Sequence, residues 1–218
     1  MNPKKRWTQC YYLSSTSNIA ERYLDCFGMM ESLTATGRGL AGLHPIMLDS
    51  ERPWALDNGV FTDSFEPDKF SSKLDAVRKW IDTCAFVVCP DVIGDYQATL
   101  DRFSRFAPWL RSLGFPVGFA TQDGLTIEQT PWGKFDALFV GGTDQHKLGP
   151  EAGALIAEGI RRGKWIHIGR VNSPKRMRQF WRANSWDGTT LSKEPGKASK
   201  IAAAVREIRV WQQTRRLI

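Results

Sequence analysis

The sequence has few cysteines and histidines, no long apolar run and no low-complexity linker. Its 218 residues include 4 cysteines and 3 histidines, and no two cysteines have CxxC spacing. This scarcity argues against a zinc knuckle or a disulfide framework, so we expect reduced thiols in the core. No apolar segment approaches the ~20 residues that a membrane-spanning helix needs. The basic segment MNPKKRW is not followed by the apolar core of a signal peptide. We therefore expect a cytoplasmic protein without a membrane partner.

Composition and charge narrow the class of protein further. Hydrophobic residues make up 42% and charged residues 24% of the chain, which is the balance of an ordinary globular domain. Without a linker or an internal repeat, we expect one domain over residues 1–218. The formal net charge of +7 has two interpretations, solubility alone or an anionic partner such as nucleic acid. Composition alone leaves both open.

Short apolar segments alternate with stretches of helical periodicity along the chain. Strands are predicted at 11–16, 30–36, 54–59, 86–91, 116–124, 137–143, 164–171 and 185–190. Helices are predicted at 18–27 (ended by Gly28), from Pro67 with Phe70, Leu74, Val77 and Ile81 on one face, at 95–113 with a kink at Pro108, from Pro150, from Ser173-Pro174, and at the C-terminus with Ile201, Ala204, Val205 and Ile208 inward; 37–52 is predicted as a loop. Eight strands alternating with helices would close a compact (β/α)8 TIM barrel. The alternative, an open doubly wound sheet, is weakened because no Gly-rich phosphate motif follows the first strand.

Carboxylates and glycines recur where the predicted strands end. The exits read Asp57-Asn58-Gly59, Pro90-Asp91, Gln122-Asp123-Gly124, Gly141-Gly142-Thr143, Gly169-Arg170 and Trp186-Asp187-Gly188. In a barrel these exits meet at one rim, where the active sites of this fold lie. A single aspartate of this kind is most simply a helix cap, but four on a basic protein are harder to explain in that way. Like charges gathered in a cleft raise each other's pKa, which suits acid–base and nucleophilic chemistry.

The residue types at the exits favour one kind of chemistry. The sequence has no Ser-His-Asp signature and no metal motif, and His167 among apolar residues is interpreted as a satisfied barrel residue rather than a base. Carboxylates without a metal motif point to an anomeric carbon, where one aspartate is the nucleophile and another the acid–base group. Gly141 and Gly142 would let backbone N–H groups approach a flat ligand. Asp91 and Gln122 offer the acceptor and donor groups that a guanine-like base needs.

The order of these segments carries a resemblance to a known family. From about residue 50 to 192, DNGVF, CPD, QDG, FVGGT, HIGRVNSPKRM and SWDGTTL resemble the tRNA-guanine transglycosylase superfamily. The chain most resembles its short branch, the 7-deazapurine DNA-modification transglycosylases of phages and bacterial genomic islands. The resemblance implies a (β/α)8 barrel that replaces guanine in DNA with a 7-deazaguanine, such as 7-cyano-7-deazaguanine, through a covalent glycosyl-aspartate. It implies no cofactor.

The resemblance also assigns roles to individual residues. Asp187 matches the nucleophile, and Asp57 matches the acid–base carboxylate. Asp91 matches a carboxylate that reads the edge of the base. Gln122-Asp123 matches a base-binding glutamine, with the register open by one residue. Gly141, Gly142 and Thr143 match the family's Gly-Gly-Leu backbone contacts. Asn58, Gly59 and Arg170, at the same strand exits, are further residues that we expect to bind substrate.

Two departures from the tRNA enzymes change the expected partner. No cysteine follows Cys89, so the zinc-binding subdomain of those enzymes is absent, no metal is expected, and tRNA becomes less favoured than DNA. Valine also replaces the second glycine of the family's motif, at Val60, which would reshape the pocket floor. The basic residues Lys175, Arg176 and Arg178 are expected to contact DNA, with a solvated face as the alternative.

Two other readings of the function stay open beside this resemblance. An N-glycoside hydrolase would remove a base without replacing it, and a non-catalytic barrel would only bind nucleic acid or a nucleobase. Substrate recognition by a homodimer or a partner subunit is also consistent with the missing subdomain.

Overall fold

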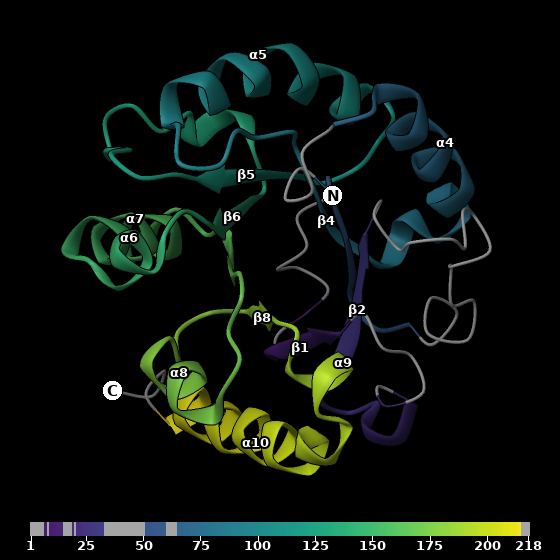
Figure 1. Cartoon of the computed structure of the whole chain (residues 1–218), viewed down its shortest axis with the longest axis vertical. Coiled ribbons are helices and arrows are strands. Elements are labelled where there is room, and N and C mark those ends of the chain that lie inside the picture. The colour runs from purple at the N-terminus through teal and green to yellow at the C-terminus, as the bar shows by residue number, and fades with distance from the viewer. Residues whose placement is uncertain are drawn as a thin grey trace.

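The computed structural model describes residues 7, 9–14, 19, 21–32, 51–59 and 65–214 (Figure 1). The predicted loop at 37–52 lies almost entirely outside the described residues, as do residues 33–36 of the second predicted strand and parts of the first predicted helix. The site predicted at the strand exits lies within them, apart from Val60.

Eight parallel strands close into a barrel. The strands are β1 (Tyr11–Ser14), β2 (Phe27–Ser32), β3 (Trp54–Asp57), β4 (Cys84–Val88), β5 (Val117–Thr121), β6 (Ala137–Val140), β7 (Trp165–Ile168) and β8 (Ser185–Asp187). Each strand pairs with the next in parallel, and β8 pairs with β1. The predicted (β/α)8 TIM barrel is therefore confirmed, and the open doubly wound sheet is excluded.

Helices surround the barrel, as Figure 1 shows. They are α4 (Pro67–Val77), α5 (Tyr96–Ser112), α6 (Asp144–Leu148), α7 (Pro150–Arg161), α8 (Pro174–Gln179), α9 (Thr190–Lys193) and α10 (Ala198–Thr214), with 3-10 turns η1 (Glu21–Tyr23), η4 (Arg78–Thr83), η5 (Trp132–Lys134) and η6 (Pro195–Lys197). Prolines open α4, α7 and α8 as predicted, because the first helical turn needs no N–H partner there. The Ser173 side chain caps α8 by accepting from the Arg176 N–H. The short helices α6 and α9 were not predicted.

The first predicted helix is wrong in its described part. Residues 18–27 were expected to form a helix ended by Gly28, but Glu21–Tyr23 form a 3-10 turn and β2 already begins at Phe27. A Cβ on Gly28 would lie 2.2 Å from the Pro53 carbonyl oxygen. This glycine therefore permits a close approach between β2 and the chain entering β3.

Strand side chains alternate between the barrel interior and the layer under the helices. The interior is filled by a buried apolar cluster: Tyr11, Leu13, Met30, Ala55, Ala85, Phe86, Val88, Ala120, Ala137 and Trp165, with Phe139 packed against it. Asp57 follows Ala55 by two residues, so it faces the interior at the carboxyl end of β3. Asp187 faces the interior in the same way, two residues after Ser185. The packed interior thus ends in a polar layer at the rim.

Other predictions about the core can be compared directly with the fold. All four cysteines are buried and none forms a disulfide with another, as expected. Ile201, Ala204, Val205 and Ile208 of α10 are buried, also as expected. The helix α5 continues through Pro108 to Ser112. None of the helices in the described part of the chain is long and apolar enough to cross a membrane.

Candidate active site at the carboxyl rim

Asp57 lies close to two further carboxylates at the rim. Its side chain is half-buried, and burial, followed by the charges of Asp187 and Asp91, raises the pKa of Asp57 to about 7. The Gly59 N–H, 3.4 Å from Asp57 Oδ1, lowers that pKa only in part. A carboxyl group that titrates near neutrality can both donate and accept a proton. The geometry therefore gives Asp57 the property that its predicted acid–base role needs.

Asp91 is buried, and side-chain amides hold both of its oxygens. Asn58 Nδ2 donates to Asp91 Oδ1 at 2.7 Å, and Gln122 Nε2 donates to Oδ2 at 2.6 Å. The Gln122 carbonyl in turn accepts from the Gly94 N–H at 2.9 Å. Burial raises the pKa of Asp91, and the hydrogen bond from Asn58 opposes that rise. Asn58, Asp91 and Gln122 thus form a buried hydrogen-bonded group that joins the exits of β3, β4 and β5.

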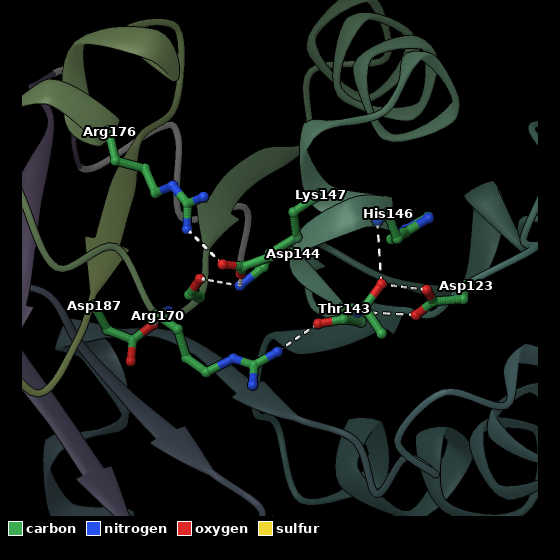
Figure 2. A network of polar contacts seen from close by, with 10 residues as sticks. Asp123, Thr143, Asp144, His146, Lys147, Arg170, Arg176 and Asp187 are labelled. Atoms are coloured by element: carbon green, nitrogen blue, oxygen red, sulfur yellow. Dashed lines mark hydrogen bonds and ion pairs between the residues drawn. The ribbon is translucent and has the colours of Figure 1, made fainter.

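Asp123 points to a different neighbour from Gln122. Its carboxylate accepts from the Thr143 N–H at 2.9 Å and from the Thr143 hydroxyl at 2.5 Å (Figure 2). Burial raises the pKa of Asp123, but the hydrogen bonds from Thr143 outweigh it, so the pKa is lowered overall. Asp123 and Thr143 therefore tie the exits of β5 and β6 together. Gln122, and not Asp123, contacts Asp91, whereas binding of a base by either residue stays a prediction.

The glycines at these exits accommodate protein atoms. A Cβ on Gly141 would lie 2.9 Å from the Thr121 carbonyl oxygen, and one on Gly142, whose φ is +74°, would lie 2.7 Å from Asp123 Oδ2. A Cβ on Gly188 would lie 2.4 Å from Asn172 Oδ1. Each glycine is thus explained by close packing between loops. The predicted approach of a ligand to the Gly141 and Gly142 N–H groups stays a prediction.

Asp187 ends β8 with one carboxylate oxygen held by two groups. The His167 Nε2 atom lies 3.0 Å from Asp187 Oδ1, and the Arg170 N–H donates to the same oxygen at 3.2 Å. The Asp187 side chain keeps 22% of its surface exposed, so a ligand at the rim can reach it. Neither Asp91 nor Asp187 caps a helix, since Asp95 caps α5 and Thr189 precedes α9.

His167 is a buried barrel residue with both ring nitrogens hydrogen-bonded, as the sequence interpretation expected. The contact that was not predicted is with Asp187, which is one of its two partners. The other partner is Ser185 Oγ, 2.8 Å from His167 Nδ1. Alternation along WIHIGR places His167 on the same face of the strand as Gly169 at the strand exit. This pattern in the sequence could have indicated that His167 points toward the site. What the sequence could not supply was the pairing of His167 with Ser185 across β7 and β8.

Arg170 connects the Asp187 site to the β6 exit. It has a φ of +60°, which is unusual for a residue with a side chain, and its guanidinium donates to the Gly142 carbonyl (Figure 2). Beside it, Asp144 pairs with Arg176 at 3.0 Å and with Lys147 at 3.2 Å. A cavity of about 570 Å³ opens here, lined by Ile93, Gly142, Thr143, Asp144, Arg170, Asn172, Ser173 and Arg176.

The three predicted DNA contacts on α8 separate in the structure. Arg176 lines the rim cavity, and Lys175 is exposed nearby. Arg178 instead binds Glu207 of α10, with Arg178 Nη2 2.8 Å from Glu207 Oε2. It therefore connects two helices on the outside of the barrel. Within the described ranges, no three His, Cys, Asp or Glu side chains are grouped so as to hold a metal ion.

Comparison with known proteins defines the fold more than the chemistry. No protein-family model and no curated protein matches the chain. A 4-hydroxy-2-oxoglutarate/2-dehydro-3-deoxyphosphogluconate aldolase is similar in structure, with a TM-score of 0.58, 14% identity and coverage of 96% of this chain and 98% of that one. Tryptophan synthase from M. tuberculosis has a TM-score of 0.53 and 12% identity, with coverage of 92% of this chain and 92% of that one. Phosphoribosyl anthranilate isomerase from Thermus thermophilus has a TM-score of 0.50 and 15% identity, with coverage of 94% of this chain and 100% of that one. At these identities the likeness establishes a shared TIM-barrel fold alone.

Proposed function

We propose that this protein is a pentosyltransferase that replaces guanine in DNA with a 7-deazaguanine base through a covalent glycosyl-aspartate. The observation that carries the proposal is the pairing of a partly exposed, oriented carboxylate with a carboxyl group whose pKa is raised to about 7. Asp187 is held through one oxygen by His167 and Arg170. Asp57 is near enough to feel its charge and has a pKa of about 7. Double displacement at an anomeric carbon needs these two properties in two neighbouring groups.

The proposed reaction balances with these two carboxyl groups. An oxygen of ionised Asp187 forms a bond to C1′ while the bond between C1′ and N9 of guanine breaks. Protonated Asp57 gives its proton to the departing base, so guanine leaves neutral. An incoming 7-deazaguanine then returns its N9 proton to the Asp57 carboxylate, and N9 displaces Asp187 from C1′. Both carboxyl groups end the cycle as they began it.

Recognition of the base is assigned to the amide-held group. A purine with a lactam N–H and an amino group presents two adjacent donors, and the Asp91 carboxylate offers acceptors that Asn58 and Gln122 hold in place. The same edge occurs in guanine and in 7-deazaguanines. Substitution at carbon 7 would not change it, so both bases could occupy one pocket in turn.

DNA is proposed as the substrate because of the basic rim. A nucleotide inside a duplex hides its C1′, so the enzyme must unstack it or act on single strands. Arg176 lines the cavity of about 570 Å³, and the preceding residue Lys175 is exposed; both are proposed to bind phosphates that flank an extruded nucleotide. The net charge of +7 agrees with a polyanionic partner.

The direct test is to incubate the protein with DNA and candidate 7-deazaguanines, including 7-cyano-7-deazaguanine, and to analyse the nucleosides by mass spectrometry. We expect incorporation by the wild type, none by Asp187→Asn, and normal incorporation by the control Asp101→Asn, an exposed carboxylate of α5. Release of guanine without incorporation would instead identify an N-glycoside hydrolase. Binding of DNA with neither reaction would identify a non-catalytic barrel.

Trapping the intermediate tests the assignment of Asp187 more closely. In the absence of an incoming base, denatured wild-type protein should carry DNA attached to the peptide that contains Asp187. Asp187→Asn is nearly isosteric and should retain the fold without forming the adduct. Attachment at another residue would overturn the assignment.

A further inference from the structure

A chain of hydrogen bonds runs through the barrel interior and ends on Asp187. Trp165 Nε1 lies 2.8 Å from Ser185 Oγ, and Ser185 Oγ lies 2.8 Å from His167 Nδ1. His167 Nε2 completes the chain, 3.0 Å from Asp187 Oδ1. Trp165, His167 and Ser185 are all fully buried. No water can therefore substitute for a missing partner without disturbing the packing.

The first member sets the direction of every later hydrogen bond. An indole N–H can only donate, so Ser185 Oγ accepts from Trp165. Among the described residues, Ser185 Oγ contacts only Trp165 and His167, so the serine proton goes to His167 Nδ1. That nitrogen then acts as an acceptor, and the histidine proton sits on Nε2, facing Asp187. The opposite tautomer would leave the serine proton without an acceptor and aim the Nε2 lone pair at a carboxylate.

Packing keeps the imidazole in this orientation. The ring packs against both Phe86 and Phe139, with centroid distances of 5.1 and 4.8 Å, and these two phenyl rings also contact each other. A fully buried imidazole packed in this way cannot rotate away from Asp187 without displacing interior side chains. The indole of Trp165 belongs to the same interior cluster.

We infer that Trp165 and Ser185 fix His167 as the Nε2–H tautomer, and that His167 is a positioning residue for the Asp187 carboxylate. His167 and the Arg170 N–H both bind Oδ1. Within the described part of the chain no donor is bonded to Oδ2, so Oδ2 is the oxygen that would attack. A neutral donor also draws less charge from the carboxylate than an imidazolium would. The inferred tautomer does not depend on the proposed function, whereas the expected effect of His167 on the rate of base exchange rests on it.

Nitrogen NMR of protein labelled with ¹⁵N-histidine tests the tautomer without any substrate. The chain has 3 histidines, so the variants His167→Gln and His146→Gln assign the signals. We expect wild-type His167 at neutral pH to be protonated on Nε2 and unprotonated on Nδ1. Ser185→Ala removes the proton donor to Nδ1, and the His167 signals should change to the other tautomer or to the charged ring. Protonation of Nδ1 in the wild type, or an unchanged spectrum in Ser185→Ala, would contradict the inference that Ser185 fixes the His167 tautomer.

Kinetics separate a positioning role from a merely structural one. Glutamine can place an amide N–H where Nε2 lies, whereas asparagine reaches only the Nδ1 position. His167→Asn should lower kcat on the order of 100-fold, the loss expected for a misplaced reacting group, with KM for DNA nearly unchanged. His167→Gln should recover much of that rate. Equal losses in both variants, or an unchanged kcat in His167→Asn, would contradict the positioning role.

The two proposals fail in different ways. If the wild-type protein incorporates no base, the proposed function is wrong, and the inferred His167 tautomer is then judged by the NMR result alone. If base exchange occurs but Nδ1 of His167 carries the proton, the inferred tautomer is wrong while the proposed function stands. Circular dichroism and thermal unfolding of each variant confirm that a lost rate does not reflect a lost fold.

Discussion

Asp57 ends β3 where burial and two carboxylates act on one side chain. Its pKa rises from an ordinary 3.8 to about 7 in the folded chain. Between these values the folded state holds a proton that the unfolded state has released, so the free energy of unfolding falls as pH rises from about 4 to about 7. The slope contributed by one such group is at most about 1.4 kcal/mol per pH unit. Asp57→Asn should flatten the curve in this range.

Urea unfolding of the wild type and Asp57→Asn at several pH values measures this contribution. Asp101→Asn, at an exposed site on α5, is the matched control and should keep the wild-type slope. An Asp57→Asn curve that still parallels the wild type would mean that Asp57 titrates normally. The rate of base exchange should change near the same pH in the wild type and lose this dependence in Asp57→Asn.

Gly142 is a residue whose backbone conformation and surroundings both exclude a side chain. Its φ is +74°, and a Cβ would lie 2.7 Å from Asp123 Oδ2. Gly142→Ala should therefore lower the free energy of unfolding by about 2 kcal/mol or more, since strain in the left-handed region and the contact with Asp123 add together.

Gly153 in α7 provides a control for the same substitution. Nothing lies within 4 Å of a Cβ placed on it, and alanine favours a helix interior over glycine. Gly153→Ala should raise the free energy of unfolding by about 0.5–1 kcal/mol. Chemical denaturation compares the two variants, and a neutral Gly142→Ala would show that the loop can shift at no cost.

At the scale of elements, α8 divides its basic residues between two tasks. Arg176 lines the rim cavity and Lys175 is exposed, whereas Arg178 binds Glu207 of α10. A lost phosphate contact reduces the slope of log affinity against log salt by roughly 0.7 to 0.9. We expect the Lys175→Ala/Arg176→Ala double variant to weaken DNA binding and to flatten that slope, with little dependence on DNA sequence.

Arg178→Ala is a control for the double variant, because it removes a positive charge from the same helix, one charge against the two that the double variant removes. It should leave DNA affinity and the salt slope close to those of the wild type. Fluorescence anisotropy with a labelled oligonucleotide at several salt concentrations measures both quantities. Equal effects of the two variants would place the DNA footprint on the outer face of α8 and α10.

At the scale of the whole molecule, barrel closure hides every thiol. Cys10, Cys26, Cys84 and Cys89 are buried and form no disulfide with one another, and burial is the largest cause of the raised pKa of Cys26, Cys84 and Cys89. Both effects oppose thiolate chemistry. A thiol reagent such as Ellman's should react slowly with the native protein and with four thiols in denaturant. Rapid native labelling would show that the barrel opens locally.

The sequence alone was sufficient for the architecture because the signals involved are local. Apolar strands alternate with helical periodicity, and the prolines at Pro67, Pro150 and Pro174 open the helices that were predicted from them. The helix predicted at 18–27 was wrong in its extent because a local pattern was misinterpreted. Glycine often ends a helix, but Gly28 lies within β2, where the Pro53 carbonyl leaves no room for a side chain. Local patterns specify which elements exist, and a parallel sheet of eight strands has few ways to close.

The site depended on contacts between residues far apart in the chain. The exits of β3, β4 and β8 could be foreseen to meet, which brought Asp57, Asp91 and Asp187 together. Whether Gln122 or Asp123 joins them depends on the direction of side chains at the end of β5, and a shift of one residue reverses it. The contact of His167 with Asp187 depends on the register between β7 and β8. The positions of the strand ends can be predicted from the sequence. The register between strands and the direction of the side chains at their ends are decided only in the closed barrel, because they depend on packing between segments that are far apart in the chain.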